Sequence, residues 1–293
     1  MPSYRLGLIG AGNMAEAIVR GTLGAKVLPP EAITAADPSP ERRRLFHDEL
    51  GVAAVEDNLA VVRRSDVIIL AVKPQMMEAV MAQVGPALGG EKLAVSIAAG
   101  VTLARLAKFC PPGARLIRAM PNTPMLVGRG MVALSRGANA TDKDVTLVRE
   151  LFASCAKVVE VPEEKMDAVT AVSGSGPAYF FYLVEALIEA GVAVGLSHQE
   201  AVKLAETTFV GAAELLASSA ALGPAPASAH AAVGAVREPP AAAASPAAAL
   251  RRRVTSPGGT TAAALAALEA DKFNEIIARA VRAARDRSRE LGR

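Results

Sequence analysis

The residues best suited to chemistry near the start of the chain form a glycine-rich turn. Gly10-Ala11-Gly12-Asn13-Met14-Ala15 follows an apolar run, opens a helical pattern and matches G-x-G-x-x-A. The first glycine permits a tight bend, the second lets a pyrophosphate approach the backbone, and the final small residue allows close helix–strand packing. Such turns also serve packing alone, but this position favours dinucleotide binding, with Gly10, Gly12, Asn13 and Met14 at the cofactor.

A second polar group, Asp37-Pro38-Ser39-Pro40-Glu41-Arg42-Arg43, follows the next apolar run. An acid at this point usually accepts hydrogen bonds from the adenosine ribose 2′-OH and repels a 2′-phosphate, whereas Arg42 and Arg43 can offset that repulsion. The same residues can instead cap and solvate the following helix. Asp37 is therefore a candidate cofactor residue, and the choice between NADPH and NADH stays open.

The segment Ala71-Val72-Lys73-Pro74 ends a later apolar run. If that run is a strand, Val72, Lys73 and Pro74 lie at the carboxyl edge of the sheet, where ligands of open α/β folds bind. Lys73 then faces either the cofactor or solvent.

Two further loops combine small and hydroxyl residues, namely Ser173–Tyr179 (SGSGPAY) and Thr255–Thr261 (TSPGGTT). Each breaks regular structure with glycines and then enters a helix, which exposes backbone N–H groups and hydroxyls to a small carboxylate. Ordinary N-capping is the alternative for either loop alone. None of the three histidines lies in a motif and no metal-ligand constellation is present, so we expect neither a histidine acid–base mechanism nor a metal ion.

The elements that must position these residues change character along the chain. Short β-branched runs alternate with helical patterns up to residue 161, which predicts a doubly wound parallel sheet of the Rossmann type in residues 1–161. Long Ala- and Leu-rich helical patterns follow, so residues 162–293 are predicted to form an all-α domain. Within it, half of the 30 residues from 220 to 249 are Ala and five are Pro, which predicts a flexible insertion. The expected strands are Arg5–Ile9, Ala32–Ala36, Val52–Glu56, Val67–Val72, Leu93–Ile97, Arg115–Ala119, Met131–Ser135 and Val158–Val161.

Composition excludes several classes of partner. A net charge of +3 over 293 residues, with no Trp, three Tyr and seven Phe, favours neither a phosphate-binding surface nor base stacking, so no nucleic acid is expected. The most apolar stretch is interrupted by Glu185 and Glu189, so no membrane span is expected. Two widely spaced cysteines and the absence of a leader pattern predict a reduced, cytoplasmic protein.

Six motifs together resemble the pyrroline-5-carboxylate reductase family in order and approximate spacing. They are Gly10–Ala15, Ala71–Pro74, Ser96–Gly100 (SIAAG), Met120–Pro124 (MPNTP), Ser173–Tyr179 and Thr255–Thr261. The resemblance implies an enzyme of proline biosynthesis that transfers hydride from NADPH or NADH to the C=N carbon of 1-pyrroline-5-carboxylate. It also implies a homodimer built through interlocked helical domains and assembled into a larger ring.

The resemblance further implies roles for particular residues. Ser256, Gly258, Gly259 and Thr260 hold the substrate carboxylate together with Ser173, Gly174 and Ser175, and the catalytic Thr261 hydroxyl points toward the imine nitrogen. Asn58 contacts the cofactor, while Ala98, Asn122 and Pro124 line the nicotinamide region. The imine can take its proton from water, which explains a site without histidine. Family members have a short turn where this chain has residues 220–249, and an acidic residue in that turn has no clear equivalent here.

Two rival functions remain open. A β-hydroxyacid dehydrogenase also joins a Rossmann domain to helices, but its catalytic lysine should lie on the long helix, and Tyr179–Val194 contains none. A noncatalytic dinucleotide sensor would keep Gly10–Ala15 and lose the two substrate loops, which are intact here.

Overall fold

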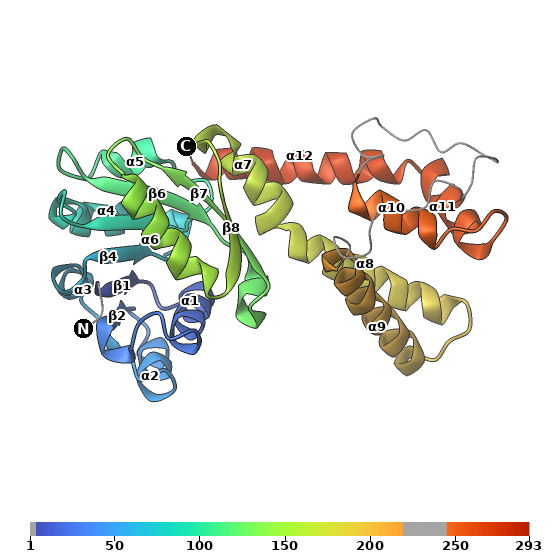
Figure 1. The fold of residues 1–293 in the computed structure, drawn as a ribbon, viewed down its shortest axis with the longest axis horizontal. Coiled ribbons are helices and arrows are strands. Elements are labelled where there is room, and N and C mark those ends of the chain that lie inside the picture. Colours follow the sequence, from blue (N-terminus) through green and yellow to red (C-terminus); the bar gives the residue numbers. More distant parts are fainter. Residues whose placement is uncertain (1–3, 219–244, 293) are drawn as a thin grey trace. The chain divides into compact units, whose positions relative to one another are not determined.

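The structure is a computed structural model that describes residues 4–218 and 245–292 (Figure 1). The chain divides into two compact units, of which the first comprises Met1–Pro177 and Ala280–Arg293 and the second comprises Ala178–Arg279. This division differs from the expected boundary at residue 161, because the helical turns directly after that residue pack on the sheet. The chain also returns to the first unit for its last helical turns.

One eight-stranded sheet, in the order β3-β2-β1-β4-β5-β6-β7-β8, forms the centre of the first unit. All neighbouring strands are parallel except β6 and β7. The segment between β6 and β7 holds one turn of 3₁₀-helix and is too short for the crossover that parallel strands require, so the chain reverses direction there. The strands are β1 Leu6–Ile9, β2 Ile33–Ala36, β3 Ala53–Val55, β4 Val67–Leu70, β5 Leu93–Ser96, β6 Arg115–Met120, β7 Gly130–Arg136 and β8 Ala156–Glu160.

Helices cover both faces of this sheet, and the core divides accordingly into two apolar clusters. One cluster joins the strands to α1 (Asn13–Gly24), α2 (Pro40–Asp48) and α6 (Asp142–Ala153), and the other joins them to α3 (Asn58–Arg64), α4 (Met77–Val84) and α5 (Leu103–Ala107). Because β1 and β4 are buried on both faces, every residue in them is buried, as in other parallel sheets. The short helical turns are η1 Pro30–Ala32, η2 Pro74–Met76, η3 Gly85–Ala87, η4 Thr123–Val127, η5 Glu163–Lys165, α7 Met166–Val169 and the π-helical η6 Thr170–Gly174.

Every element described in the second unit is a helix, and the helices are α8 Gly176–Ala193, α9 His198–Ala217, α10 Pro246–Arg253, α11 Thr260–Ala270 and α12 Phe273–Leu291, with α8 and α12 extending into the first unit. The segment Ser197-His198-Gln199-Glu200 has the sequence pattern of a capping box, and this box is formed at the start of α9. Many large apolar side chains of α8 and α9 stay exposed, among them Phe181, Tyr182 and Leu204.

The predicted insertion at 220–249 is described only at its end. Residues 220–244 lie outside the described residues. Residues 245–249 form the capped start of α10 rather than an irregular segment, because the Ser245 hydroxyl accepts a hydrogen bond from the Ala248 amide. Pro246 is the first residue of that helix, where the missing N–H costs nothing.

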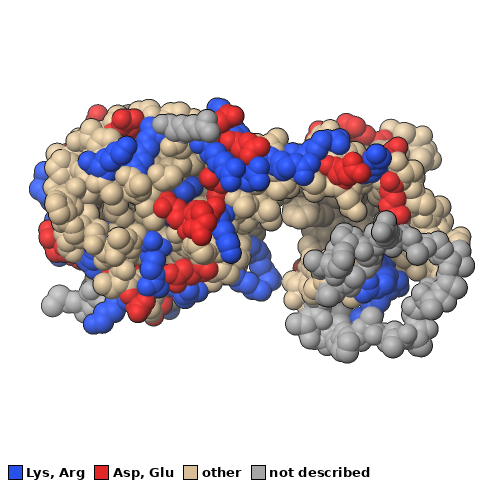
Figure 2. Space-filling view, turned by 90° about the horizontal axis from the view of Figure 1, so that it is seen from above, with Lys and Arg blue, Asp and Glu red and all other residues tan. Residues whose placement is uncertain are grey.

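Charges of both signs are interspersed over the face of the first unit drawn in Figure 2, rather than gathered into one basic patch. Among the described helices, none combines the length and apolarity needed to cross a membrane.

Candidate active site

The carboxyl end of β1 carries the glycine-rich turn. Gly10 has a φ of +96°, and a Cβ on it would lie 2.8 Å from the carbonyl oxygen of Ala71, so the fold itself requires glycine there. Gly12, the N-cap of α1, has an ordinary φ of −72°, and a Cβ on it would meet no atom within 4 Å. Protein packing therefore does not explain Gly12. The open side of Gly12 and the first N–H groups of α1 leave room for an anion, as the predicted pyrophosphate site requires.

Asp37, at the carboxyl end of β2, braces this turn. Its Oδ2 accepts a hydrogen bond of 2.8 Å from the Ala11 amide, and its Oδ1 accepts one of 2.9 Å from the Ser39 amide. The Arg42 guanidinium also contacts this turn and donates from Nε to the carbonyl oxygen of Ala11 at 2.6 Å. The sequence interpretations of Asp37 included neither contact, and no local spacing signals them. The carboxylate holds the turn in shape, and its place at the cofactor stays a prediction.

Arg42 also forms an ion pair with a residue of α1. Its Nη2 lies 2.8 Å from a carboxylate oxygen of Glu16, and Glu16 also pairs with Arg20. Burial opposes the ionisation of Glu16, but hydrogen bonds from Arg42 and Arg20 outweigh it and lower the pKa of Glu16. Arg43 donates to the carbonyl oxygens of Asp37 and Pro38. Arg42 thus stabilises the glycine turn after β1, and Arg43 stabilises the turn after β2.

The sheet order brings the other candidate cofactor residues to one edge. Because β2, β1, β4, β5 and β6 are neighbouring parallel strands, the residues after their carboxyl ends lie along the same edge. Val72, Lys73 and Pro74 follow β4, and the exposed Lys73 precedes the turn η2. Ala98 follows β5 and is buried. Asn58 opens α3, where its amide donates to Gln83 at 2.9 Å.

Asn122, after β6, connects this edge to the Ser173 segment. Its Nδ2 donates to the carbonyl oxygen and hydroxyl of Ser173 at 3.2 and 3.3 Å, and its Oδ1 accepts from the Met131 amide at 2.9 Å. Pro124 lies two residues further on, in the turn η4. The structure therefore brings a predicted nicotinamide residue and a predicted substrate residue into direct contact.

The Ser173–Tyr179 segment is not the open loop that the sequence predicts. The Ser175 amide donates to the carbonyl oxygen of Thr170 at 2.8 Å, which makes residues 170–174 a π-helical turn that runs into α8. A Cβ on Gly174 would collide with Met120, so the turn packs tightly on the end of β6. The Ser175 N–H is therefore not free, contrary to the prediction, because the π-helical turn continues into α8 without an intervening loop. π-Helical turns are frequent at functional sites.

The Thr255–Thr261 loop belongs to the second unit and has the expected form. Gly258 has a φ of +67°, and a Cβ on Gly259 would collide with the Ser256 hydroxyl. Gly259 is the N-cap of α11, and no side chain caps this helix. The first N–H groups of α11, including those of Thr260 and Thr261, therefore have no side-chain cap, as the predicted carboxylate site requires.

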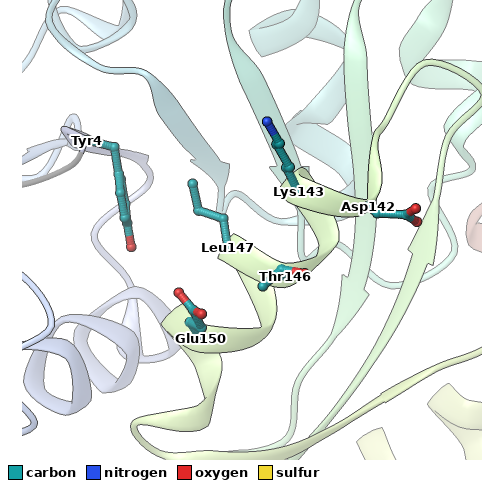
Figure 3. Close-up of a pocket in the computed structure, with 6 residues that line it drawn as sticks. All are labelled: Tyr4, Asp142, Lys143, Thr146, Leu147 and Glu150. Carbon is teal, nitrogen blue, oxygen red and sulfur yellow. The ribbon is translucent and has the colours of Figure 1, made fainter.

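A surface hollow lies elsewhere in the first unit (Figure 3). It is lined by Tyr4, Asp142, Lys143, Thr146, Leu147 and Glu150. Tyr4 precedes β1, so the hollow lies at the amino end of that strand, opposite the glycine turn. Burial and then the Glu150 carboxylate raise the pKa of Tyr4 to about 12. The hollow is separate from the candidate active site.

Metal ligands are not grouped in the part of the chain that the structure describes. Residues 4–218 and 245–292 contain no cluster of three or more His, Cys, Asp or Glu side chains able to hold a metal ion. Within the same ranges Cys110 and Cys155 are free thiols.

Two family descriptions match parts of the chain. Pyrroline-5-carboxylate reductase dimerisation matches residues 163–291, and NADP oxidoreductase, coenzyme F420-dependent, matches residues 5–100.

Individual proteins match over most of their length. A pyrroline-5-carboxylate reductase of Glycine max is 42% identical over 217 residues, which are 74% of this chain and 79% of that protein. The structure of a Plasmodium falciparum pyrroline carboxylate reductase with NADP bound is 30% identical, has a TM-score of 0.81 and covers 100% of both chains. A pyrroline-5-carboxylate reductase structure from Coxiella burnetii is 31% identical, with a TM-score of 0.83 and 99% of both chains covered.

Proposed function

The chain belongs to the pyrroline-5-carboxylate reductase family, and from this premise we propose how its residues divide the work of the reaction. The enzyme reduces the C=N bond of 1-pyrroline-5-carboxylate with NADPH or NADH and forms L-proline, the last step of proline biosynthesis. The single observation that best supports these roles is the open space beside Gly12. It lies in a turn that is held by hydrogen bonds between Ala11 and the side chains of Asp37 and Arg42.

The glycine turn binds the pyrophosphate of the cofactor. The uncrowded side of Gly12 and the N-terminal amides of Asn13 and Met14 face the anion, and Gly10 supplies the bend. Asp37 keeps this turn in place and lies near the adenosine ribose. Asn58 contributes to the same cofactor site at the start of α3.

The carboxyl edge of β4, β5 and β6 would hold the nicotinamide. Val72, Lys73 and Pro74 would contact the cofactor after β4, while Ala98, Asn122 and Pro124 would line the nicotinamide ring. The bound cofactor supplies the hydride. Asn122 has its amide engaged with Ser173 and Met131, so it fixes the shape of this edge as well as lining it.

The N-terminus of α11 holds the substrate carboxylate. Its uncapped N–H groups and the hydroxyls of Ser256 and Thr260 suit a small anion, and Gly258 and Gly259 allow the bend before the helix. The Thr261 hydroxyl donates a hydrogen bond to the ring nitrogen, and this bond strengthens as hydride adds to the C=N carbon and electron density moves onto the nitrogen. The Ser173–Ser175 turn contributes hydroxyl groups beside the nicotinamide edge.

The protein supplies positioning rather than a proton-transfer side chain. The imine nitrogen is basic enough to take its proton from water, so the groups around it need only orient the ring and support the charge. The described residues place no histidine along this sheet edge, since His47 lies in α2 and His198 opens α9.

The helical region is an oligomerisation domain. We infer a homodimer that assembles into a larger ring, as the family resemblance implies. The large apolar side chains that α8 and α9 expose, such as Phe181, Tyr182 and Leu204, support a subunit interface. Light scattering during gel filtration tests this inference: a monomeric mass contradicts the dimer, and a dimeric mass contradicts the ring. The free thiols Cys110 and Cys155 support a reducing, cytoplasmic location, which cell fractionation tests.

One assay tests the proposed function against its rivals. Oxidation of NADPH and of NADH is followed at 340 nm with 1-pyrroline-5-carboxylate, and reduction of NAD(P) is followed with a 3-hydroxy acid. Turnover of the imine alone supports the proposal. Turnover of the hydroxy acid favours a β-hydroxyacid dehydrogenase, and cofactor binding without either turnover favours a sensor.

A further inference from the structure

A buried arginine lies beneath the nicotinamide edge of the sheet. Arg118, in β6, is 3% exposed and pairs in register with Ser96 of β5. Its guanidinium lies 3.4 Å from a carboxylate oxygen of Glu163 and 3.6 Å from one of Asp167. A buried charge needs such partners, so this contact holds the segment that begins with Glu163 against the sheet.

The same Asp167 binds the last turns of α12. The Ser288 hydroxyl donates to Asp167 Oδ1 at 2.7 Å, and the Arg289 Nε lies 3.8 Å from Oδ2. Ser288 is 2% exposed although its helix is rich in charge. Figure 1 shows this end of α12 beside α7. One carboxylate therefore ties α7, β6 and α12 together.

The end of α12 also touches the backbone after β5. Gly100 has a φ of +79°, and a Cβ on it would lie 2.5 Å from the carbonyl oxygen of Ser288 and 3.0 Å from the amide nitrogen of Gly292. A Cβ on Gly292 would collide with the carbonyl oxygen of Gly100. The two backbones are in direct contact, and Gly100 closes the segment Ser96–Gly100 that contains Ala98.

We propose that Ser288 and Asp167 are positioning residues for hydride transfer, because with Arg118 they seat the end of α12 on Gly100 and set the backbone around Ala98. The inference rests on the proposed function, in which Ala98 lines the nicotinamide. Neither residue is among those proposed to hold the cofactor. Their loss loosens the nicotinamide end of the site, while the pyrophosphate stays on the distant glycine turn.

The chain offers a matched control for this idea. Ser288→Ala removes one buried hydroxyl and its hydrogen bond to Asp167. Ser65→Ala removes another buried hydroxyl, which donates to the carbonyl oxygen of Val61 at 2.8 Å on the α3 side of the sheet. Both changes remove one buried hydrogen bond, but only the first lies on the path to Ala98. Asp167→Asn is a second probe, which keeps the acceptor for Ser288 and removes the charge opposite Arg118.

The experiment measures four quantities for each full-length variant. They are the thermal midpoint, the Kd for NADPH, the fluorescence intensity of bound NADPH and kcat with saturating 1-pyrroline-5-carboxylate. We expect Ser288→Ala and Asp167→Asn to lower kcat roughly tenfold and to change the bound fluorescence, with Kd altered less than about threefold. Ser65→Ala lowers the thermal midpoint and leaves kcat and fluorescence unchanged.

The outcomes separate this inference from the proposed function. Unchanged kcat and fluorescence in Ser288→Ala, or the same losses in Ser65→Ala, overturn the positioning role. If Ser288→Ala does not fold, Asp167→Asn decides by the same criteria. If the unaltered enzyme does not reduce 1-pyrroline-5-carboxylate, the proposed function fails, and the fluorescence of bound NADPH still tests the positioning of the nicotinamide.

Discussion

The open space at Gly12 provides a direct test of where the cofactor pyrophosphate binds. Gly12→Ala adds one methyl group to a residue whose φ of −72° suits any side chain and whose Cβ would meet no protein atom within 4 Å. The folded protein accommodates this change without strain. A pyrophosphate seated on the turn does not, because the methyl group occupies the space through which it approaches the backbone.

The two effects differ in size. Alanine is a poorer N-cap than glycine, so the variant loses about 1 kcal/mol of stability, a shift of a few degrees in Tm. Displacing the pyrophosphate weakens one or two charge-assisted hydrogen bonds to the backbone, which contribute about 1.5 to 3 kcal/mol each. A net loss of about 2 to 3 kcal/mol raises the Kd for the cofactor roughly 30- to 150-fold.

The assay is a fluorescence titration with NADPH and with NADH, accompanied by thermal unfolding of the unliganded protein. Gly24→Ala is the matched control, since Gly24 ends the same helix and also has no neighbour within 4 Å of a Cβ. That control should bind both cofactors normally and gain about 0.5 to 1 kcal/mol of stability.

Two results would refute the reasoning about Gly12. A Kd within about threefold of the unaltered enzyme means that the pyrophosphate does not approach this residue. A fall in Tm of more than about ten degrees means that the turn is packed more tightly than its geometry indicates. In that case weak binding reports unfolding rather than a steric conflict with the cofactor.

Three further changes test other parts of the site. Thr261→Ala should lower kcat/KM roughly ten- to a hundredfold with an unchanged Kd for NADPH, as expected for one charge-assisted hydrogen bond, and an unaltered kcat/KM removes Thr261 from the mechanism. Asp37→Asn replaces one carboxylate oxygen with an NH2 group, which cannot accept the hydrogen bond from the Ala11 amide. The change should raise KM for NADPH and for NADH by similar factors of about ten. A rise in KM confined to NADH would mean that the carboxylate binds the ribose instead of holding the turn. Burial raises the pKa of the Cys110 and Cys155 thiols, so native protein at pH 8 should react with iodoacetamide at least about tenfold more slowly than protein in urea, and equal rates contradict this.

Much of the fold could be predicted because its signals are local. All eight expected strands are present within two residues of their predicted limits, since β-branched runs and turn residues act over a few positions. The capping box at Ser197 and the glycine turn at Gly10 are equally local. The reversal at β7 was missed, because the direction of a strand depends on how the preceding connection crosses the sheet.

The sequence by itself determined the order of strands and helices, the glycine turn and the family to which its motifs belong. Tertiary structure decided which side chains meet: Asp37 with the Ala11 amide across 26 positions, Asn122 with Ser173 across 51, and Ser288 with Asp167 across 121. Periodicity and capping depend on neighbours within a turn or two. Contacts between distant positions depend on strand order and helix packing, which no single segment encodes, so they emerge only when the whole sheet and its covering helices are assembled.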